Sequence, residues 1–255
     1  MAYRFSIITP CLNARETIRE TIESVLQQRT AAVEYIIIDG GSTDGTLDII
    51  NEYADAIDVF ISEPDDGISD AFNKGISLAT GDYIGIINAD DYYEPGALQA
   101  ISVIAEQHHT PDVIHGSLRY LPATGSHYVE HPNISRIFDY MSVFHPTLFI
   151  HRNAYKSVGL YSKKFRYAMD SEWVHRAITA KLTFIQSPEI ISNMRLEGTS
   201  HQYMHRSLFE FYRSATRHGA SQLSAGYYFI RQLMIQTLIN IDWVKRAALK
   251  RRNKK

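Results

Sequence analysis

Short apolar runs alternate with amphipathic helical patterns along the first 110 residues of the chain. The runs are rich in Ile, Val and Phe, which predicts buried strands over residues 4–9, 34–38, 59–62 and 82–87. Apolar residues at helical spacing predict helices between them, after Asn13, over residues 46–53 and over residues 68–79, and Pro95 indicates the start of another. Asn13 with Glu16 three residues later is typical of a capping box. This alternation indicates a parallel sheet covered by helices on both faces.

The pattern changes after about residue 111. Two runs at 113–120 and 127–131, joined by a turn at 123–125, predict a β-hairpin. Further expected elements are a strand over 145–150, a helix over 171–180, and strands over 182–185 and 190–194, with helices from His201 onward. We therefore expect an α/β domain over residues 1–200, with a mostly parallel central sheet, and a C-terminal helical extension over residues 201–255.

Three predicted strands end in residues that can carry chemistry, namely Thr9, Asp39 and Asn88. The carboxyl ends of parallel strands lie along one edge of the sheet, where ligands bind. Asn88 is followed closely by Asp90 and Asp91. Buried carboxylates are costly unless their charge is compensated. This segment therefore forms either a polar turn or a set of oxygen ligands for a cation, and the pattern alone leaves both interpretations open.

Composition and charge exclude several classes of protein. The 255 residues carry a formal net charge of −2, with a pI near 6.6, which gives no signal for nucleic acid as a partner. The single cysteine, Cys11, excludes an internal disulfide and suits a reducing compartment. No apolar run approaches the roughly 20 residues of a membrane span, and the N-terminus lacks the long apolar region of a signal peptide. A cytoplasmic location is expected.

The C-terminal segment is an exception to this even charge distribution. Apolar residues at roughly helical spacing run from Tyr228 to Ala247, and seven basic residues without any acid lie between Lys245 and the end. A basic amphipathic end suits an anionic membrane surface, which predicts peripheral attachment to the inner face of a membrane. The alternative is a helix that packs on the domain and carries a solvated tail, and the sequence favours neither.

Four segments, taken in order, resemble the family 2 glycosyltransferases. They are SIITPCLNARETIRETIESVLQQ at 6–28, IIIDGGSTDGT at 36–46, the block at 62–91 that ends in a DxD-type metal motif, and MDSEWVHRA at 169–177. The resemblance covers roughly residues 4–195 and implies a GT-A fold, a nucleotide-sugar donor, a divalent cation (Mn²⁺ or Mg²⁺) and inversion at the anomeric carbon. A UDP-sugar is the first expectation, with GDP- and dTDP-sugars as alternatives.

The resemblance also implies which residues would bind the nucleotide, listed here as Thr9, Pro10, Asp39, Asp66, Gly67, Asn88 and Ala89. Asp39 would accept an N–H of the base, although Gly40 replaces the second acid that is usual in this turn. The alternative for Asp66 is a simple helix cap.

The metal ligands implied by the resemblance are Asp90 and Asp91, with Asn88 at a position where the family often has Asp. His201 would add a third ligand, because imidazole suits Mn²⁺. Arg195 and His145 are assigned to the diphosphate or acceptor region. Their alternatives are an ordinary surface loop for Arg195 and His201, and a structural role for His145.

Asp170 is the catalytic base that the resemblance implies. The family usually has Glu-Asp here, whereas this chain has Met169-Asp170, with Trp173 and Arg176 in the expected places. Asp170 would take the proton of the acceptor hydroxyl. Two alternatives are that Asp170 is the N-cap of the following helix and that the neighbouring Glu172 is the base.

The function expected from these residues is inverting transfer of a sugar from a nucleotide-sugar to a glycan or lipid-linked acceptor, in bacterial surface polysaccharide biosynthesis. A nucleotidyltransferase is one alternative, but its Gly-rich basic loop would stand where this chain has PCLNARE. A non-catalytic nucleotide-sugar-binding subunit of a polysaccharide assembly complex is another, and the presence of Asp90, Asp91 and Asp170 argues against it.

Overall fold

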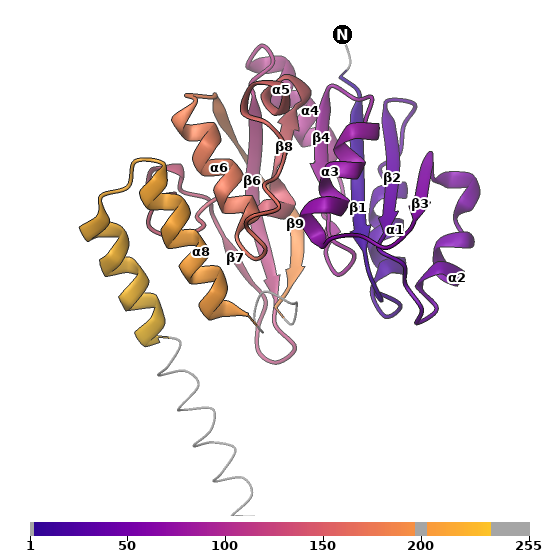
Figure 1. The fold of residues 1–255 in the computed structure, drawn as a ribbon. Helices are drawn as coiled ribbons and strands as arrows, with labels where there is room; N and C mark the ends of the chain where they lie inside the picture. Colours follow the sequence, from indigo (N-terminus) through magenta and orange to yellow (C-terminus); the bar gives the residue numbers. More distant parts are fainter. Residues whose placement is uncertain (1–2, 197–202, 236–255) are drawn as a thin grey trace, which may run out of the picture.

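The protein is described here by a computed structural model, which covers residues 3–196 and 203–235. A nine-stranded sheet in the order β3-β2-β1-β4-β8-β6-β9-β5, with β7 paired to β6, runs through the molecule. Figure 1 shows the two halves of this sheet beside each other, with α1 to α3 around the first half and α6 and α8 on the second. The predicted α/β class is confirmed.

The first half has the predicted parallel order. Strand β1 pairs in parallel with both β2 and β4, and β2 pairs in parallel with β3. The strands are β1 (Phe5–Cys11), β2 (Val33–Asp39), β3 (Val59–Ser62) and β4 (Tyr83–Ile86). The helical elements between and after them are α1 (Ile18–Leu26), α2 (Thr46–Asn51), η1 (Ala54–Ala56), α3 (Ile68–Leu78) and α4 (Ala97–Gln107).

Antiparallel pairing enters in the second half. Strand β8 (Phe149–His151) is antiparallel to β4 and to β6 (Val113–Leu121), and β6 forms the predicted hairpin with β7 (Tyr128–Glu130). Strand β9 (Phe184–Arg195) is parallel to β6 and antiparallel to the short β5 (Tyr92–Tyr93). The sheet is therefore parallel over β1 to β4 and mixed overall, because hairpins and short returns reverse the chain where no crossover helix is present.

Three local predictions differ from the structure, and two elements were not predicted. Residues 145–147 form a 3₁₀ helix, η3 (His145–Thr147), since Pro146 lacks the N–H that a strand ladder needs. The two strands expected over 182–194 are one strand, β9, with register shifts against β6. Asn13 does not cap α1; it has φ 51° and its Oδ1 accepts the Thr43 N–H at 2.9 Å. Strand β5 and helix α5 (Arg152–Val158) were not predicted.

Alternate residues of the central strands build two hydrophobic cores, one on each face of the sheet. Ile8, Ile36 and Ile86 form one row across β1, β2 and β4 and pack with α3, α5 and α6 (Met169–Thr179). Their neighbours Ile7 and Ile37 face the other way and pack with α1 and α4. Because both faces are buried, apolar residues dominate these strands, and the polar Ser6 and Thr9 within β1 are themselves buried.

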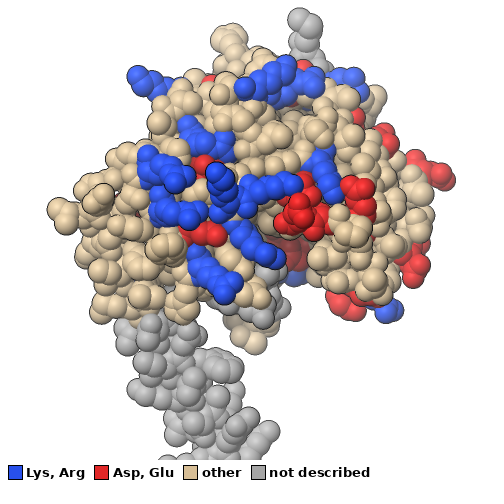
Figure 2. Space-filling model, viewed as in Figure 1, with Lys and Arg blue, Asp and Glu red and all other residues tan. Residues whose placement is uncertain are grey.

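The C-terminal segment is helical, as predicted. Helix α8 (Met204–Arg217) packs against α6, and a further helix occupies residues 222–235 beside it (Figure 1). The domain boundary proposed at residue 200 and the residue His201 lie outside the described residues, as do residues 236–255. No helix within 3–196 and 203–235 has the length and apolarity to cross a membrane. On the face in Figure 2, Lys and Arg gather over the α6 and α8 side, and Asp and Glu lie to the right of them.

Candidate active site

A cleft of about 480 Å³ opens where β1 and β4 end. Its walls come from the segment after β1, the start of α3, the turn after β4 and the end of β9. Seven of the residues predicted from the sequence line it, namely Pro10, Gly67, Asn88, Ala89, Asp90, Asp91 and Arg195. Segments more than 100 residues apart in the chain therefore meet at one edge of the sheet, as expected for ligand sites in α/β proteins.

Asp90 and Asp91 lie in a tight turn, in which Asp91 is buried and Asp90 is half-buried. The Asp91 N–H donates to the Asn88 carbonyl at 3.0 Å, and Asp91 is 1% exposed. Burial raises the pKa of both carboxyl groups, and for Asp91 the neighbouring charge of Asp90 raises the pKa further. A buried carboxylate such as that of Asp91 is costly unless its charge is compensated.

The donor atoms at this turn fit a divalent cation. The Asn88 Oδ1 is buried and accepts no hydrogen bond from the described residues, and it stands beside two carboxylates. Oxygen ligands of this kind are those that Mg²⁺ and Mn²⁺ prefer. No group of three or more His, Cys, Asp or Glu side chains arranged for a metal occurs in the described part of the chain. Phosphate oxygens of a substrate commonly complete such a site.

Arg195 borders the acid pair at the end of β9. Its backbone N–H donates to Asp91 Oδ1 at 3.3 Å, and its guanidinium donates to the Asp90 carbonyl and pairs with Glu20. The guanidinium also lies 5.6 Å from the centre of the Tyr92 ring. A positive charge is therefore fixed at the rim of the cleft, next to the two carboxylates.

Asp39 is present at the predicted strand end but does not line the cleft. Its fully buried carboxylate accepts the N–H groups of Gly41 (3.0 Å) and Ser42 (2.9 Å) and the Ser62 hydroxyl (2.7 Å). Burial alone would raise the pKa of Asp39, but the hydrogen bonds from Ser42 and Ser62 lower it overall. Asp39 thus stays charged and holds the turn after β2, and its contact with a base remains a prediction.

Thr9 is also fully buried, with its hydroxyl 3.1 Å from that of Tyr35, and it does not line the cleft. Cys11, two residues on, does line it. Burial raises the pKa of the Cys11 thiol, so this side chain is neutral. The end of β1 therefore offers the cleft backbone groups and small neutral side chains.

Asp65, which the sequence interpretation did not single out, lines the cleft in place of its neighbour Asp66. Asp66 is 82% exposed and pairs with Lys163, and no side chain caps α3, so the helix-cap alternative is wrong. A Cβ atom added to Gly40 would lie 2.8 Å from Asp65 Oδ2. The Asp65 carboxylate thus occupies the space that a side chain at position 40 would need. The sequence signal that could have indicated a role for Asp65 was the absence of an acid at Gly40 together with two adjacent acids at 65–66.

Asp170 lies in the first turn of α6 and is half-buried. The N-cap of this helix is Ala168, so the N-cap alternative for Asp170 is wrong. The Asp170 Oδ1 accepts the Ser171 N–H at 2.7 Å. Asp170 is not among the residues that line the cleft, so the structure does not bring it together with Asp90 and Asp91 there.

His145 connects Asp170 to the wall of the cleft. Its ring packs edge-on against the Phe72 ring of α3, with ring centres 4.9 Å apart. Ala71, the residue that precedes Phe72 in α3, lines the cleft. Burial lowers the pKa of His145, while the negative charge of Asp170 raises it. Neither ring nitrogen has a hydrogen-bond partner among the described residues. His145 is therefore a neutral, buried ring close to Asp170.

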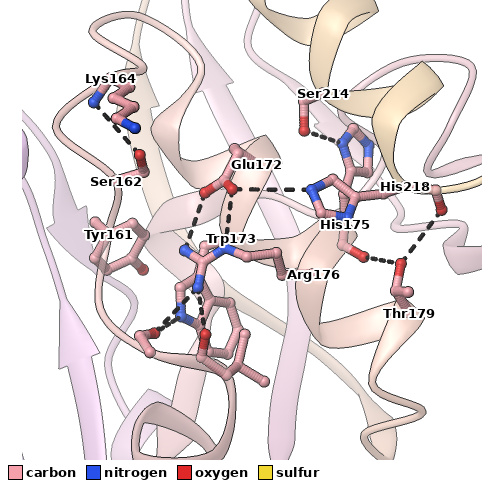
Figure 3. Close-up of polar contacts among 12 residues, drawn as sticks. Tyr161, Ser162, Lys164, Glu172, Trp173, His175, Arg176, Thr179, Ser214 and His218 are labelled. Atoms are coloured by element: carbon pink, nitrogen blue, oxygen red, sulfur yellow. Dashed lines mark hydrogen bonds and ion pairs between the residues drawn. The ribbon is translucent and has the colours of Figure 1, made fainter.

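Glu172, the alternative candidate for the base, is paired with Arg176. It is 5% exposed, and its two oxygens accept hydrogen bonds from Arg176, each at 2.9 Å (Figure 3). Arg176 also donates to the Leu160 carbonyl at 2.8 Å, and the Trp173 ring N–H donates to the Gly159 carbonyl at 2.8 Å. Glu172 is thus unavailable as a base. With Arg176 it fixes the chain that enters α6, and so positions Asp170.

The other side of α6 is fixed by His175, which is fully buried. Its Nδ1 lies 2.8 Å from the Ser214 hydroxyl of α8 and its Nε2 lies 3.0 Å from the Ile137 carbonyl (Figure 3). Burial lowers the pKa of His175 to about 4. The ring is therefore neutral, and it accepts from Ser214 and donates to Ile137, joining α8 to α6.

The profile described as Glycosyl transferase family 2 matches residues 6–167 of this chain. A PGL/p-HBAD biosynthesis glycosyltransferase of Mycobacterium bovis is 27% identical over 221 residues, which cover 84% of this chain and 86% of that protein. A putative teichuronic acid biosynthesis glycosyltransferase of Bacillus subtilis, TuaG, is 39% identical over 97 residues, covering 37% of this chain and 38% of that protein.

Solved structures of similar fold include S. aureus TarS 1-349 in complex with UDP-GlcNAc. It aligns with a TM-score of 0.66 at 18% identity, and the alignment covers 90% of this chain and 71% of the TarS chain. The mannosyltransferase PcManGT from Pyrobaculum calidifontis, in complex with GDP-Man and Mn²⁺, aligns with a TM-score of 0.67 at 18% identity, over 90% of this chain and 70% of its own. These likenesses confirm the predicted GT-A fold. Because the family profile spans more than half of the sequence, the chain belongs to glycosyltransferase family 2.

Proposed function

We propose that this glycosyltransferase binds a nucleotide-sugar in the cleft and transfers its sugar, with inversion, to a hydroxyl group of a glycan or lipid-linked acceptor. The observation that carries the proposal is the turn at Asn88, Asp90 and Asp91, where one buried and one half-buried carboxylate stand beside a buried amide oxygen that has no hydrogen-bond partner among the described residues. Such a turn is stable and useful when a cation compensates its charge.

The cleft has the size and chemistry for a nucleotide. Its volume of about 480 Å³ lies within the usual range of ligand pockets, roughly 300–1,000 Å³. The end of β1 and Asp65 offer polar groups to the nucleoside, and the start of α3 at Gly67 lines the same wall. The donor we propose first is a UDP-sugar, supported by the UDP-GlcNAc held by TarS, with GDP- and dTDP-sugars as alternatives.

Asp90 and Asp91, with the Asn88 oxygen, would hold Mn²⁺ or Mg²⁺. When bound, such a cation stabilises the negative charge on a leaving diphosphate. The Mn²⁺ in PcManGT supports this assignment. Arg195 is fixed beside the acid pair, where its guanidinium would approach the diphosphate. His201 lies outside the described residues, and its role as a further ligand remains a proposal.

Asp170 would act as the general base. It would accept the proton of the acceptor hydroxyl as that oxygen forms a bond to the anomeric carbon, on the face opposite the diphosphate. The bond between the anomeric carbon and the diphosphate oxygen breaks, and its electron pair leaves with the diphosphate. Inversion follows because attack and departure occur on opposite faces. The commitment of Glu172 to Arg176 supports Asp170 as the base.

We also propose that the chain acts in the synthesis of a surface polysaccharide or glycolipid and attaches peripherally to a membrane. The names of the mycobacterial and Bacillus subtilis relatives support the first part. The basic C-terminal sequence supports the second, although residues 236–255 lie outside those described.

A thermal-shift panel of UDP, GDP, dTDP and ADP, each with Mn²⁺ or with EDTA, tests the proposal. One nucleotide is expected to raise the melting temperature in Mn²⁺ and to do so much less in EDTA, and hydrolysis of the corresponding nucleotide-sugars then identifies the donor. Absence of any nucleotide-specific shift in Mn²⁺ would contradict a donor site in the cleft and would favour the non-catalytic alternative.

A further inference from the structure

Helix α8 presents a basic face to solvent. Its exposed side chains include His205, Arg206, Arg213 and Arg217, one above the other along the helix. The one acid of α8, Glu210, lies beside Arg206 and Arg213, and its carboxylate accepts the N–H groups of residues 166–168 at 3.1, 2.7 and 3.0 Å. With three arginines against this one carboxylate, the face keeps a net positive charge.

The guanidinium groups of this face contact aromatic rings and neutral oxygens. Arg206 reaches the Tyr167 hydroxyl at 3.4 Å, and Arg213 reaches the Lys164 carbonyl at 3.3 Å and lies 4.5 Å from the centre of the Phe165 ring. Neither forms an ion pair with a carboxylate within residues 3–196 and 203–235. With Lys164, His205 and Glu210 they line an open hollow of about 340 Å³, on the side where Figure 2 shows Lys and Arg gathered.

An exposed aromatic ring accompanies this charge. Phe209 lies in the same hollow and is 55% exposed. A small soluble anion would need the basic groups but not this apolar ring. The headgroup region of a bilayer offers negative charge and an apolar boundary together.

A second copy of the chain fits this surface less well. The C-terminal sequence adds seven basic residues after Asp242 with no acid among them. Pairing two copies through the same surface would bring like charges together, which is unfavourable. An anionic lipid surface is complementary to the α8 face and to the following sequence.

The surface is joined directly to the catalytic helix. Glu210 holds residues 166–168, which lead straight into α6 and Asp170. On the other flank, Lys163 pairs with Asp70 of α3 at 2.6 Å and with Asp66 at 3.5 Å, next to the start of α3 that lines the cleft. A lipid layer bound to this surface would therefore lie next to the end of α6 that carries Asp170.

We propose that the basic face of α8, with Phe209, is a docking surface for an anionic lipid bilayer, which brings the Asp170 end of α6 to a lipid-linked acceptor. The docking stands on the charge and apolar exposure of this surface, while the delivery of the acceptor rests on the proposed function. The docking surface lies on the folded domain and adds to any contribution of the basic C-terminal sequence.

Flotation of the full chain with vesicles of phosphatidylcholine, with and without phosphatidylglycerol, tests the docking. The variant Arg206→Gln/Arg213→Gln is compared with two doubles of equal charge change, Arg19→Gln/Lys156→Gln on other exposed faces and Lys250→Gln/Arg251→Gln near the C-terminus. We expect the Arg206/Arg213 double to bind phosphatidylglycerol vesicles about 25-fold more weakly, about fivefold for each lost basic side chain. The Arg19/Lys156 double should stay within about twofold of the natural chain.

A second variant, Phe209→Ala, keeps the charge and removes the exposed ring, so it should weaken vesicle binding severalfold at unchanged charge. Equal binding by the natural chain and the Arg206/Arg213 double, or an effect confined to the Lys250/Arg251 double, would overturn the docking surface. Displacement from vesicles by micromolar inorganic pyrophosphate at fixed ionic strength would also overturn it, in favour of a free-anion site.

The nucleotide thermal shift in Mn²⁺, measured on the same variants, separates the two proposals. We expect it to be unchanged in the Arg206/Arg213 double, which leaves the cleft intact and shows that the variant is folded. If vesicle binding follows the expected pattern while no nucleotide shifts any of these proteins, the docking surface holds and the donor site fails.

Discussion

The two halves of the sheet bury similar side chains but place their functional groups differently. In β1 to β4 the strands are parallel, and the candidate donor residues lie where strands end, in turns of a few residues. In the second half the candidate base lies in the first turn of a helix, and buried side-chain contacts such as Glu172 with Arg176 hold that helix. A strand end is positioned by the backbone ladder, whereas a helix end needs side chains to position it.

The halves also differ in which titratable groups they bury. The first half buries carboxylates, with the pKa of Asp91 raised by burial and by the charge of Asp90. All eleven histidines of the chain follow residue 107, and burial lowers the pKa of two of them, His115 and His175, to about 4. The first half therefore buries acidic groups at its cleft, whereas the buried histidines of the second half are neutral near pH 7 and its buried Glu172 is paired with Arg176.

The largest effect is expected at Asp170. Replacing it by Asn removes the proton acceptor and keeps the shape, so the transfer rate should fall by about 10²–10⁴-fold, the usual contribution of a general base. Donor binding, which belongs to the other half, should be unchanged in the thermal-shift assay. Asp55→Asn, at an exposed acid in η1, is the matched control and should leave both quantities unchanged. Loss of donor binding in Asp170→Asn would assign Asp170 to the donor site instead.

The next effect concerns the donor half. Asp90→Ala removes a proposed cation ligand, so calorimetry with UDP should show the loss of the Mn²⁺-dependent part of the affinity. Altering a residue that merely supports a metal ligand costs about 10–100-fold, and removing a ligand should cost more. In EDTA the affinity should stay equal or rise, because one negative charge near the diphosphate is gone. Equal affinities for the variant and the natural chain in Mn²⁺ would contradict the assignment.

Most of the donor half could be predicted from the sequence because its signals are local. Strand β3 was predicted at its observed bounds, and the other strands within about two residues, since each is a short apolar run between turn formers. Most of the residues assigned to the nucleotide and the metal line one cleft. Which of Asp65 and Asp66 faces this cleft could not be predicted, because it depends on the backbone at Gly67, where φ is 104°.

The second half was harder to predict because its pairing is not local. Strand β8 joins β4 to β6, and β9 pairs with both β6 and β5, between segments that are far apart in the sequence. Neither the two-residue β5 nor the packing of His145 on Phe72 has a periodic signal. The position of Asp170 could be predicted only through resemblance to a family, since a single acid at a helix start is common.

Arg176→Ala tests whether the buried contacts of the second half are what holds α6. The change leaves the Glu172 carboxylate buried without its partner, so the free energy of unfolding in urea should fall by about 3 kcal/mol. Arg19→Ala breaks a pair of the same kind in the first half, where Arg19 and Glu52 are 45% and 53% exposed, and should cost less than about 1 kcal/mol. Similar losses in the two variants would show that Arg176 is as dispensable as a surface arginine.

The smallest effect is a pH dependence confined to the second half. His175 is neutral in the fold, with its pKa lowered to about 4 by burial, whereas in the unfolded chain its pKa is near the ordinary value of about 6.5. As the pH falls from about 6.5 towards 4, the unfolded chain takes up a proton that the folded chain does not. The contribution of His175 to the free energy of unfolding is therefore fully present above about pH 6.5 and is lost over this range. Between pH 7 and pH 5, His175 alone should cost about 2 kcal/mol.

Amide hydrogen exchange can locate this loss. Protection of α6 and α8 should fall between pH 7 and pH 5, after correction for the intrinsic exchange rate, by more than protection of β1 to β4, which contain no histidine. In His175→Gln the amide can still donate to the Ile137 carbonyl and accept from Ser214, but it does not titrate. The pH-dependent loss in α6 should therefore shrink by about 2 kcal/mol in this variant. If α6 keeps the full pH dependence without His175, or if β1 to β4 lose as much protection as α6, then buried histidine is not what distinguishes the two halves in acid.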